Sequence, residues 1–523
     1  MREIEEIDVL ILGGGINGCG TFRDLCAQGV DCLLLERTDF CAGASAGSSR
    51  LMHGGLKYLE TGEFRLVRES AEERNRLLAN APHYVTPLPS ILPVRSRFGG
   101  IVPSILRFFG LKAGMSDRGS LITRLGLTLY DIYGRKFAKM PKHRILSRAQ
   151  LDRMVPGLDP GIVAAGLYYE GRISHAERLG LELVLDGEAL HPASRALNHA
   201  HIVAQSDGIV RYEHEGRLFQ VRPRIIVNAG GAWIDAINTA IGIPSQLMGG
   251  SKGGHLVVEN PALSRALGGR MVYFGTADGR VNLVYPFMGR VLIGSTDIKI
   301  AAPDQAVCDR SESDDLRGVV AEIFPDIPVT EDQIRFTFSG VRPLPRADGD
   351  IGSVTRDHSV AERALPSGTP VLCLIGGKWT TFRAFAQQIT DDILGRLERA
   401  RRLGTQEMAI GGGKEFPTPD ERDGWIADCA NETGLPAARV EMLLDRYGTR
   451  ARLLAAELGA DTPLSSLPRF SRQELVWLID NERVGSLEDL IRRRTDIAIS
   501  GDLTAEVERE VASLFEGHRA VAS

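Results

Sequence analysis

The chain has 523 residues, of which 43% are hydrophobic and 25% charged, and its formal net charge at pH 7 is −5. This composition is typical of a globular protein, and the length is too great for one ordinary core, so we expect two or three domains. The small acidic excess gives no reason to expect a nucleic-acid partner.

Membrane insertion and secretion are not indicated either. The first residues lack the basic, apolar and small-residue plan of a signal peptide, and no apolar run approaches the roughly 18 residues of a spanning helix. The seven cysteines are an odd number and include no CxxC pair. We therefore expect a reducing, cytoplasmic location without a disulfide framework.

Residues 8–36 are predicted to form a strand, a glycine-rich turn, a helix and a second strand. The apolar run Asp8–Leu12 has the β-branched content of a buried strand. After Gly20, the segment "TFRDLCAQG" has apolar residues at helical spacing, and Gly29 is placed to end the helix. The run "DCLLLE" then reads as a second strand that closes a βαβ unit.

The glycines of this turn form the dinucleotide fingerprint GxGxxG. Gly13 would permit the tight turn, Gly15 the approach of a pyrophosphate, and Gly18 the packing of the helix on the strand. Glu36 follows about 20 residues later, where a carboxylate accepts hydrogen bonds from a ribose diol. The alternative is a glycine-rich turn without a ligand, and the fingerprint alone does not separate NAD from FAD.

The following segments resemble a known family. Residues 43–60, "GASAGSSRLMHGGLKYLE", combine small side chains with a His-Gly-Gly turn and are similar to the FAD-dependent, quinone-linked glycerol-3-phosphate dehydrogenases. The resemblance continues in order through "IIVNAGGAWID", "SKGGHLVV", "VYPFMGRVLIGSTD", "FSGVRPL", "TRDH" and "GGKWTTFRAFAQ". It implies FAD as the cofactor and an α/β fold with a Rossmann-like FAD-binding domain of the D-amino-acid-oxidase/glutathione-reductase-2 type.

The resemblance also implies three domains. We expect a discontinuous FAD-binding domain over residues 1–75, 185–240 and 350–400. An antiparallel-sheet substrate domain is expected over residues 76–184 and 241–349, and a helical C-terminal domain over residues 405–523. Two details come from the residues themselves. "GRVNLVYPFMGRVLIGSTD" is predicted to form a β-hairpin, and the segments beyond the Gly- and Pro-rich linker near 411–418 have apolar residues at helical spacing.

Residues 98–112, "FGGIVPSILRFFGLK", are apolar but carry Pro103 and two cations. They could lie in a membrane interface, or could cover the core as a loop and helix. The resemblance favours the first reading, because the similar enzymes pass electrons to membrane quinone. It implies a peripheral protein on the cytoplasmic, inner face of the cell membrane, and a homodimer is compatible with the sequence.

Oxidation of an alcohol phosphate requires fixed cations for the phosphate. Arg342 in "GVRP" and Lys378 in "GGKWTTFR" are candidates because glycine and proline surround them, and Thr380 offers a hydroxyl. The resemblance associates the positions of Lys57, Arg342 and Lys378, with Tyr58, with substrate binding or catalysis. Arg356 in "TRDH" is a further substrate-binding candidate.

The proton of the alcohol requires a base, and arginine is a poor one because it stays protonated. His53 could accept the proton as a neutral imidazole, and His255 is an alternative. A third reading places His53 against the cofactor. We therefore predict Arg342, His53 and Lys378 as catalytic and expect no metal site, because the histidines are scattered without ligand spacing.

The predicted cofactor-binding residues gather in four segments. They are Gly13, Gly15, Asn17, Gly18 and Glu36, then Ser48, Ser49, His53 and Gly54, then Ala229 and Gly230, and finally Gly377, Lys378, Trp379 and Thr380. The last segment contributes two residues, Lys378 and Thr380, that are also predicted to bind substrate.

The predicted reaction is oxidation of sn-glycerol 3-phosphate to dihydroxyacetone phosphate, with quinone as electron acceptor. Lys57 stands where the family usually has Arg, and Ser174–Arg178 replaces an Asp-Asp-Ala-Arg run. Since Lys and Arg are not equivalent at a phosphate site, a larger polyol phosphate such as erythritol phosphate is an alternative substrate. Both changes are equally compatible with drift at positions away from the pocket. An amine oxidase of the same fold and a non-catalytic flavin-binding protein are the rival classes.

Overall fold

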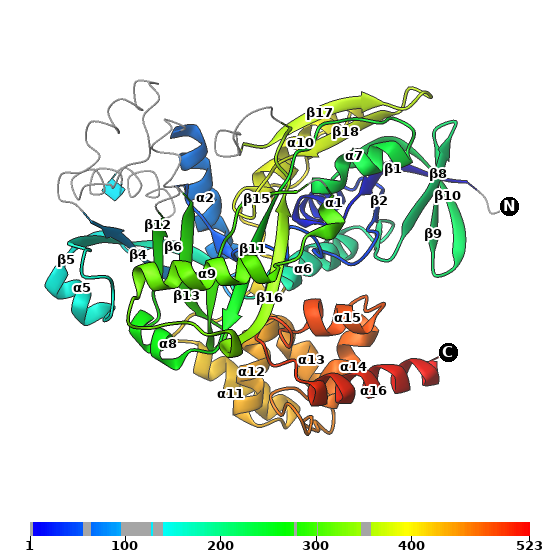
Figure 1. Cartoon of the computed structure of the whole chain (residues 1–523). Coiled ribbons are helices and arrows are strands. Elements are labelled where there is room, and N and C mark those ends of the chain that lie inside the picture. The colour runs from blue at the N-terminus through cyan, green and yellow to red at the C-terminus, as the bar shows by residue number, and fades with distance from the viewer. Residues whose placement is uncertain are drawn as a thin grey trace, which may run out of the picture.

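A computed structural model of the chain is shown in Figure 1. It describes residues 4–55, 64–95, 127–128, 140–276, 280–300, 302–346 and 357–522. The predicted substrate residues Lys57, Tyr58 and Arg356 and the apolar segment 98–112 lie outside these ranges.

The first sheet is mostly parallel. Its strands run in the order β17–β18–β10–β1–β2–β7, with β9 paired to β10 and β8 to β9. Their bounds are β1 (Glu5–Leu12), β2 (Cys32–Leu35), β7 (Arg195–Leu197), β8 (His201–Ser206), β9 (Ile209–His214), β10 (Arg217–Asn228), β17 (Ser359–Ala364) and β18 (Pro370–Ile375). β1 pairs in parallel with both β2 and β10, so the predicted βαβ unit is confirmed.

Helices cover one face of this sheet. α1 (Ile16–Ala27) connects β1 to β2 and packs against α6 (Ala176–Leu190) and α10 (Phe382–Arg396). The residues Val9–Leu12 of β1 are buried, as expected of a parallel strand covered on both sides. On the other face, α7 (Ile234–Ala240) and the ribbon β8–β9 complete the core.

The second sheet is mostly antiparallel and lies beside the first (Figure 1). Its order is β15–β11–β14–β13–β12–β4–β6–β3, with β16 paired to β11 and β5 to β6. The bounds are β3 (Leu51–Met52), β4 (Val85–Val94), β5 (Arg144–Ser147), β6 (Ala164–Ile173), β11 (Ser251–Val258), β12 (Met271–Gly275), β13 (Val281–Phe287), β14 (Arg290–Gly294), β15 (Ile298–Lys299) and β16 (Ile334–Arg342). β13 and β14 pair as the predicted hairpin.

Further helices flank this sheet and form the C-terminal part. Near the sheet are α2 (Phe64–Asn80), α5 (Arg148–Met154), α8 (Pro261–Leu267) and α9 (Arg310–Ile323). The C-terminal part contains α11 (Arg422–Thr433), α12 (Ala437–Tyr447), α13 (Ala451–Glu457), α14 (Arg472–Asn481), α15 (Leu487–Asp489) and α16 (Ala505–Ala522). It has its own apolar core, and the buried pair Arg178–Glu482, at 2.6 Å, connects it to α6.

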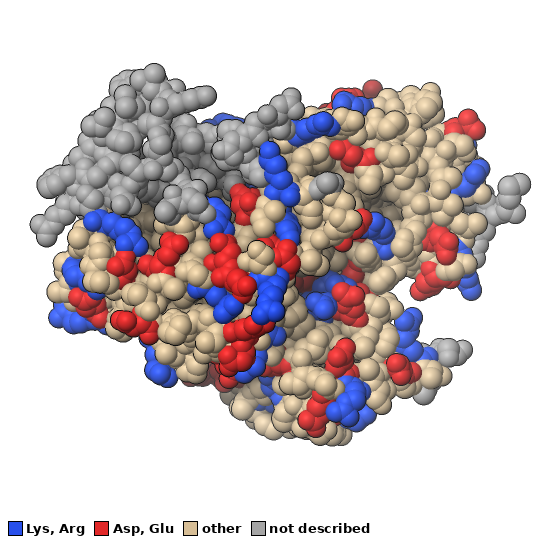
Figure 2. Space-filling model, in the orientation of Figure 1, with Lys and Arg blue, Asp and Glu red and all other residues tan. Residues whose placement is uncertain are grey.

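The division into three domains at the stated boundaries stays a prediction. Two details differ from these boundaries: β3 lies in the expected FAD-binding segment 1–75 but belongs to the second sheet, and α6 begins in the expected substrate segment 76–184 but packs on α1. Within the described ranges, none of the helices combines the length and apolar content needed to cross a membrane. Acidic and basic side chains lie intermingled on the face shown in Figure 2.

Candidate active site

One cavity of about 1280 Å³ lies where the two sheets meet. It is lined by residues that follow β1, β2, β10 and β18, and by residues of β11, β12, β13 and β16. The first group marks the carboxyl edge of the parallel strands. From β1 the chain continues to β2 on one side, whereas the strand of this sheet that follows β10, on the other side of β1, is β17, which pairs with β18 beyond β10. The connections from β1 and β10 therefore run in opposite directions, and such a switch point is where open α/β sheets bind ligands.

The fingerprint glycines meet different neighbours. Gly13 has φ +109°, and a Cβ on it would lie 2.8 Å from the carbonyl carbon of Ala229. A Cβ on Gly18 would lie 1.9 Å from the carbonyl oxygen of Gly13, so both positions exclude side chains for structural reasons. At Gly15 the nearest atom, Ser45 Oγ, would be 3.5 Å away. Space is therefore open beside Gly15, which lines the cavity.

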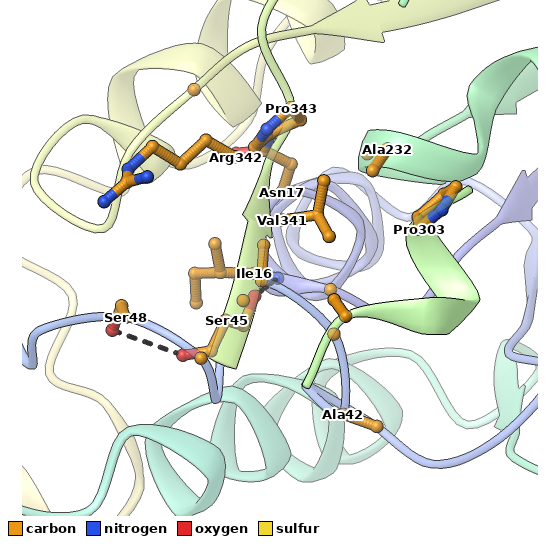
Figure 3. A pocket seen from close by; sticks show the side chains of 18 of the residues that line it. Ile16, Asn17, Ala42, Ser45, Ser48, Ala232, Pro303, Val341, Arg342 and Pro343 are labelled. Carbon is orange, nitrogen blue, oxygen red and sulfur yellow. Dashed lines mark hydrogen bonds between the residues drawn. The ribbon is translucent and has the colours of Figure 1, made fainter. Parts of the chain in front are cut away.

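The small-residue loop that the sequence highlighted lies against the start of α1. The Ile16 amide donates to Ser45 Oγ at 3.0 Å, and Trp379 Nε1 donates to the Ser45 carbonyl at 3.0 Å. Figure 3 shows Ser45 and Ser48 below Ile16, with Arg342 extending to the left of β16 and Pro303 to the right. Ser45 was absent from the predicted residues, although it stands within the quoted small-residue segment.

The carboxylate of Glu36 lies at the predicted place and is oriented by the backbone. One oxygen accepts from the Gly14 amide at 2.7 Å, and the other accepts from the Thr38 amide at 2.8 Å. Glu36 lines the cavity together with Arg37 and Thr38. The geometry therefore holds an acidic group beside the glycine turn, where the sequence predicts a ribose contact.

Asn17 and the glycines after β18 form another wall. Asn17 Nδ2 donates to the Gly376 carbonyl at 3.1 Å, while Asn17 Oδ1 is buried without a hydrogen-bond partner in the described part of the chain. Gly377 has φ +92°, and a Cβ there would lie 2.6 Å from Asn17 Nδ2. A buried acceptor without a donor points to a ligand in the cavity.

His53 faces the cavity with 40% of its side chain exposed. Its carbonyl accepts from Thr380 Oγ1 at 3.2 Å, and the next amide, Gly54 N, donates to the buried carboxylate of Glu170 at 2.9 Å. The ring of Tyr273 lies 6.0 Å from the His53 ring, centroid to centroid. The backbone on both sides of His53 is thus anchored while the imidazole stays accessible.

His255, the alternative base, is buried. Its Nε2 lies 2.8 Å from Ser49 Oγ, and its ring stacks on Phe338 with centroids 4.7 Å apart. Burial, together with the positive charge of Arg342, lowers the pKa of His255 to about 3. The imidazole is therefore neutral near neutral pH.

Arg342 ends β16 and is held by the segment after β14. Nη1 donates to Asp297 at 3.1 Å and to Ser251 Oγ at 3.4 Å, and Nη2 donates to Ser295 Oγ at 2.9 Å and to the Thr296 carbonyl at 3.1 Å. The guanidinium lies against Gly253, where a Cβ would be 2.4 Å from Nη2. Arg342 and Lys378 both line the cavity.

The structure brings most of the described candidates to this one cavity. Gly18 and Gly54 do not line it, whereas the other described candidates do: Gly13, Gly15, Asn17, Glu36, Ser48, Ser49, His53, Ala229, Gly230, Arg342, Gly377, Lys378, Trp379 and Thr380. Sequence reasoning missed Ser45, Glu170, Tyr273, Asp297 and Trp233, which also line it. Asp297 could have been noticed as a residue of the site, because it ends the block "GSTD", which belongs to the family resemblance.

A comparison with protein families matches residues 8–383 to the family described as FAD dependent oxidoreductase. The chain belongs to the FAD dependent oxidoreductase family. Residues 403–520 match the family described as the C-terminal domain of alpha-glycerophosphate oxidase. The expected fold class is confirmed, and the cofactor of this oxidoreductase is FAD.

Among curated relatives, a glycerol-3-phosphate dehydrogenase of Synechocystis is 33% identical, with 95% of this chain and 91% of the relative covered. A D-erythritol 1-phosphate dehydrogenase of Brucella abortus is 31% identical, with 95% of each chain covered. Among solved structures, a glycerol-3-phosphate dehydrogenase of Bacillus halodurans, complexed with FAD, has a TM-score of 0.73 and 22% identity, over 98% of this chain and 91% of that one.

The cavity residues fit this cofactor. The open space beside Gly15 suits a pyrophosphate at the start of α1, where amide groups and the helix dipole favour an anion. The Glu36 carboxylate suits a ribose diol, and the partnerless Asn17 Oδ1 suits a hydrogen-bond donor of the ligand.

Proposed function

We propose that this oxidoreductase oxidises the secondary alcohol of sn-glycerol 3-phosphate to the ketone of dihydroxyacetone phosphate and passes the electrons to quinone. The observation that carries the proposal is the match along nearly the whole chain. The Synechocystis relative covers 95% of this chain and is named a glycerol-3-phosphate dehydrogenase. The cavity supports it, because Arg342, Lys378 and His53 line the same space as the cofactor residues.

Bound FAD supplies the redox chemistry by accepting the hydride from the alcohol carbon. The protein residues orient the substrate. Arg342 is held by four acceptors, so its position at the end of β16 is fixed before the substrate binds. Lys378 follows two glycines and presents a second cation to the same cavity. Lys378 can polarise the oxygen that becomes the ketone.

We assign the hydroxyl proton to His53 rather than to His255. A base with a pKa near 3 holds a proton weakly, and His255 is buried with its Nε2 against Ser49. His53 lines the cavity with 40% of its side chain exposed, and a neutral imidazole can accept a proton. The anchoring of its carbonyl and of the Gly54 amide limits the movement of the ring.

A larger polyol phosphate is the second candidate substrate. The observation that favours it is the D-erythritol 1-phosphate dehydrogenase of Brucella abortus, which is 31% identical over 95% of both chains. The sequence departure at Lys57 is compatible with a larger substrate, whereas Ser174–Arg178 do not line the cavity. An amine oxidase is less favoured, since a glycine oxidase of Geobacillus kaustophilus covers 78% of this chain at 16% identity and a TM-score of 0.52, a likeness of fold alone.

Quinone as acceptor, attachment to the inner face of the cell membrane, and a homodimer belong to the same proposal. Quinone and the membrane attachment rest on the family resemblance and on the apolar residues 98–112, and a homodimer is compatible with the sequence. Sedimentation of the protein with lipid vesicles, compared between the full chain and a variant with Phe108 and Phe109 changed to Ser, tests the attachment. Loss of vesicle binding in the variant supports it, and equal binding or no binding by either protein contradicts it.

Anaerobic reduction of the flavin tests the substrate. The FAD-loaded protein is mixed with three-, four- and five-carbon polyol phosphates, and with glycine, and the loss of flavin absorption is followed in time. The proposal predicts the fastest reduction by sn-glycerol 3-phosphate. Faster reduction by a four-carbon compound selects the second candidate, and reduction by glycine alone selects the amine oxidase.

A further inference from the structure

A carboxylate lies beside the Arg342 guanidinium, and the mechanism proposed above assigns it no role. Asp297 follows the β14 strand and accepts from Arg342 Nη1 at 3.1 Å. The two side chains are 27% and 28% exposed, and both line the cavity. The pair therefore stands at the cavity wall, and a substrate that reaches Arg342 also reaches Asp297.

Further hydrogen bonds of Arg342 reinforce this arrangement. Its two terminal nitrogens also donate to the hydroxyls of Ser251 and Ser295 and to the carbonyl of Thr296. An arginine that captures a carboxylate or phosphate usually presents both terminal nitrogens to it as a fork. Here both terminal nitrogens point at protein acceptors.

The charge of the pair has a direct consequence. An anion beside Arg342 would also meet the negative charge of Asp297, so the attraction and the repulsion largely cancel. A second cation, Lys252 of β11, does not change this, because it is bonded to Glu312 at 2.6 Å and to the Val307 carbonyl at 2.9 Å. An ionised carboxylate is, however, a good acceptor for a hydroxyl group.

We propose that Asp297 is a specificity-determining residue that neutralises Arg342 and accepts a hydrogen bond from a substrate hydroxyl. This wall of the cavity then takes the neutral, hydroxyl-bearing end of the substrate, and it rejects anions such as 2-hydroxy acids and amino acids. The phosphate lies away from Arg342. The inference rests on the proposed function, because it specifies which end of a polyol phosphate lies beside Arg342.

The test compares the FAD-loaded wild type with Asp297→Asn, which keeps the shape and removes the charge. Lactate serves as a small anionic probe, and its dissociation constant is measured from the change in flavin absorption without turnover. We expect lactate to bind at least tenfold more tightly to Asp297→Asn, which corresponds to about 1.4 kcal/mol. Asp445→Asn is the matched control, since Asp445 pairs with Arg422 at 2.7 Å in the helical part.

Two further variants guard against a folding defect. Asp297→Ser also removes the charge, and the lactate affinity must rise in it. Asp297→Glu keeps the charge, and its lactate affinity must stay close to that of the wild type. Equal lactate affinity in the wild type, Asp297→Asn and Asp297→Ser overturns the proposal.

The outcome is separable from that of the proposed function. If no polyol phosphate reduces the flavin of the wild type, the proposed function fails, yet the lactate comparison still decides whether Asp297 neutralises Arg342. If polyol phosphates do reduce it, Asp297→Asn is expected to lower kcat/KM for them at least tenfold. An unchanged kcat/KM overturns the hydroxyl contact.

Discussion

The guanidinium of Arg494 donates two hydrogen bonds to the carboxylate of Asp39, at 2.7 and 2.8 Å, and connects the C-terminal part of the chain to the loop after β2. Both side chains are buried, and Arg493 adds a third bond to Asp39 at 2.6 Å. Burial by itself raises the pKa of Asp39, but the two arginines outweigh it and lower the pKa to about 2. The same loop begins with Glu36, so the contact positions one wall of the cofactor cavity.

Replacement of Arg494 by Met is expected to destabilise the protein by about 3–5 kcal/mol, because it removes a partner from a buried carboxylate. Urea unfolding of the FAD-saturated protein measures the effect. Arg492→Met in the same turn is the control, since the Arg492 side chain is 46% exposed and its effect should stay below about 1 kcal/mol. A similar small effect for Arg494→Met would show that the buried pair does not stabilise the structure.

Gly15 and Gly18 are expected to respond differently to alanine. Gly15→Ala finds room, with its Cβ 3.5 Å from Ser45 Oγ, so the folded protein should keep its stability while the affinity for FAD falls at least tenfold. Gly18→Ala would place its Cβ 1.9 Å from the Gly13 carbonyl oxygen and should destabilise the apoprotein itself.

Thermal unfolding of the two apoproteins and titration with FAD, followed by flavin fluorescence, distinguish these outcomes. The fingerprint assignment is refuted if Gly15→Ala binds FAD as the wild type does. It is also refuted if both variants lose stability to the same extent, because Gly15 would then be structural.

The sequence predicted the parts of the fold that local patterns determine. The βαβ unit of β1, α1 and β2 and the β13–β14 hairpin follow from apolar periodicity and turn residues over fewer than about 40 residues. The glycines with positive φ, such as Gly13 and Gly377, were also recognisable, since no other residue adopts that backbone as readily.

Contacts between distant charged residues were not predictable from one sequence. Asp39 and Arg494 are separated by 455 positions, and Asp297 and Arg342 by 45. Any of 62 basic residues could have paired with either carboxylate, and no periodicity marks the choice. The sequence pattern identified Arg342 as a cation of the site but did not indicate the carboxylate that neutralises it.

Protonation of His255 is expected to make the protein less stable in acid. The pKa of this imidazole is about 3 in the folded protein and about 6.5 in the unfolded chain, so only the unfolded chain takes up the proton between those values. Stability is therefore lost as the pH falls from 6.5 toward 3, by about 1.4 kcal/mol for each pH unit.

The variant His255→Asn removes the titratable imidazole and keeps a side chain that can form a hydrogen bond with Ser49. Urea unfolding at about pH 6.5 and about pH 5 should show that the wild type loses about 2 kcal/mol more than the variant over this interval. An identical loss in both proteins would mean that His255 does not stay neutral in the folded state.

Replacement of His53 by Gln is expected to lower kcat/KM for the polyol phosphate about 100- to 10,000-fold, the usual contribution of a general base. The FAD content should stay at the wild-type level, because the bonds from Thr380 to the His53 carbonyl and from the Gly54 amide to Glu170 involve the backbone. His518→Gln in α16, remote from the cavity, is the control. A decrease smaller than tenfold would show that a group other than His53 accepts the proton.

Anaerobic addition of sn-glycerol 3-phosphate to the purified, FAD-loaded protein, followed by visible absorption, tests whether the protein oxidises this substrate with its flavin. We expect the flavin band to disappear and one dihydroxyacetone phosphate to form for each flavin reduced. A protein that binds no FAD, or a flavin band that three-, four- and five-carbon polyol phosphates all leave unchanged, would contradict this expectation.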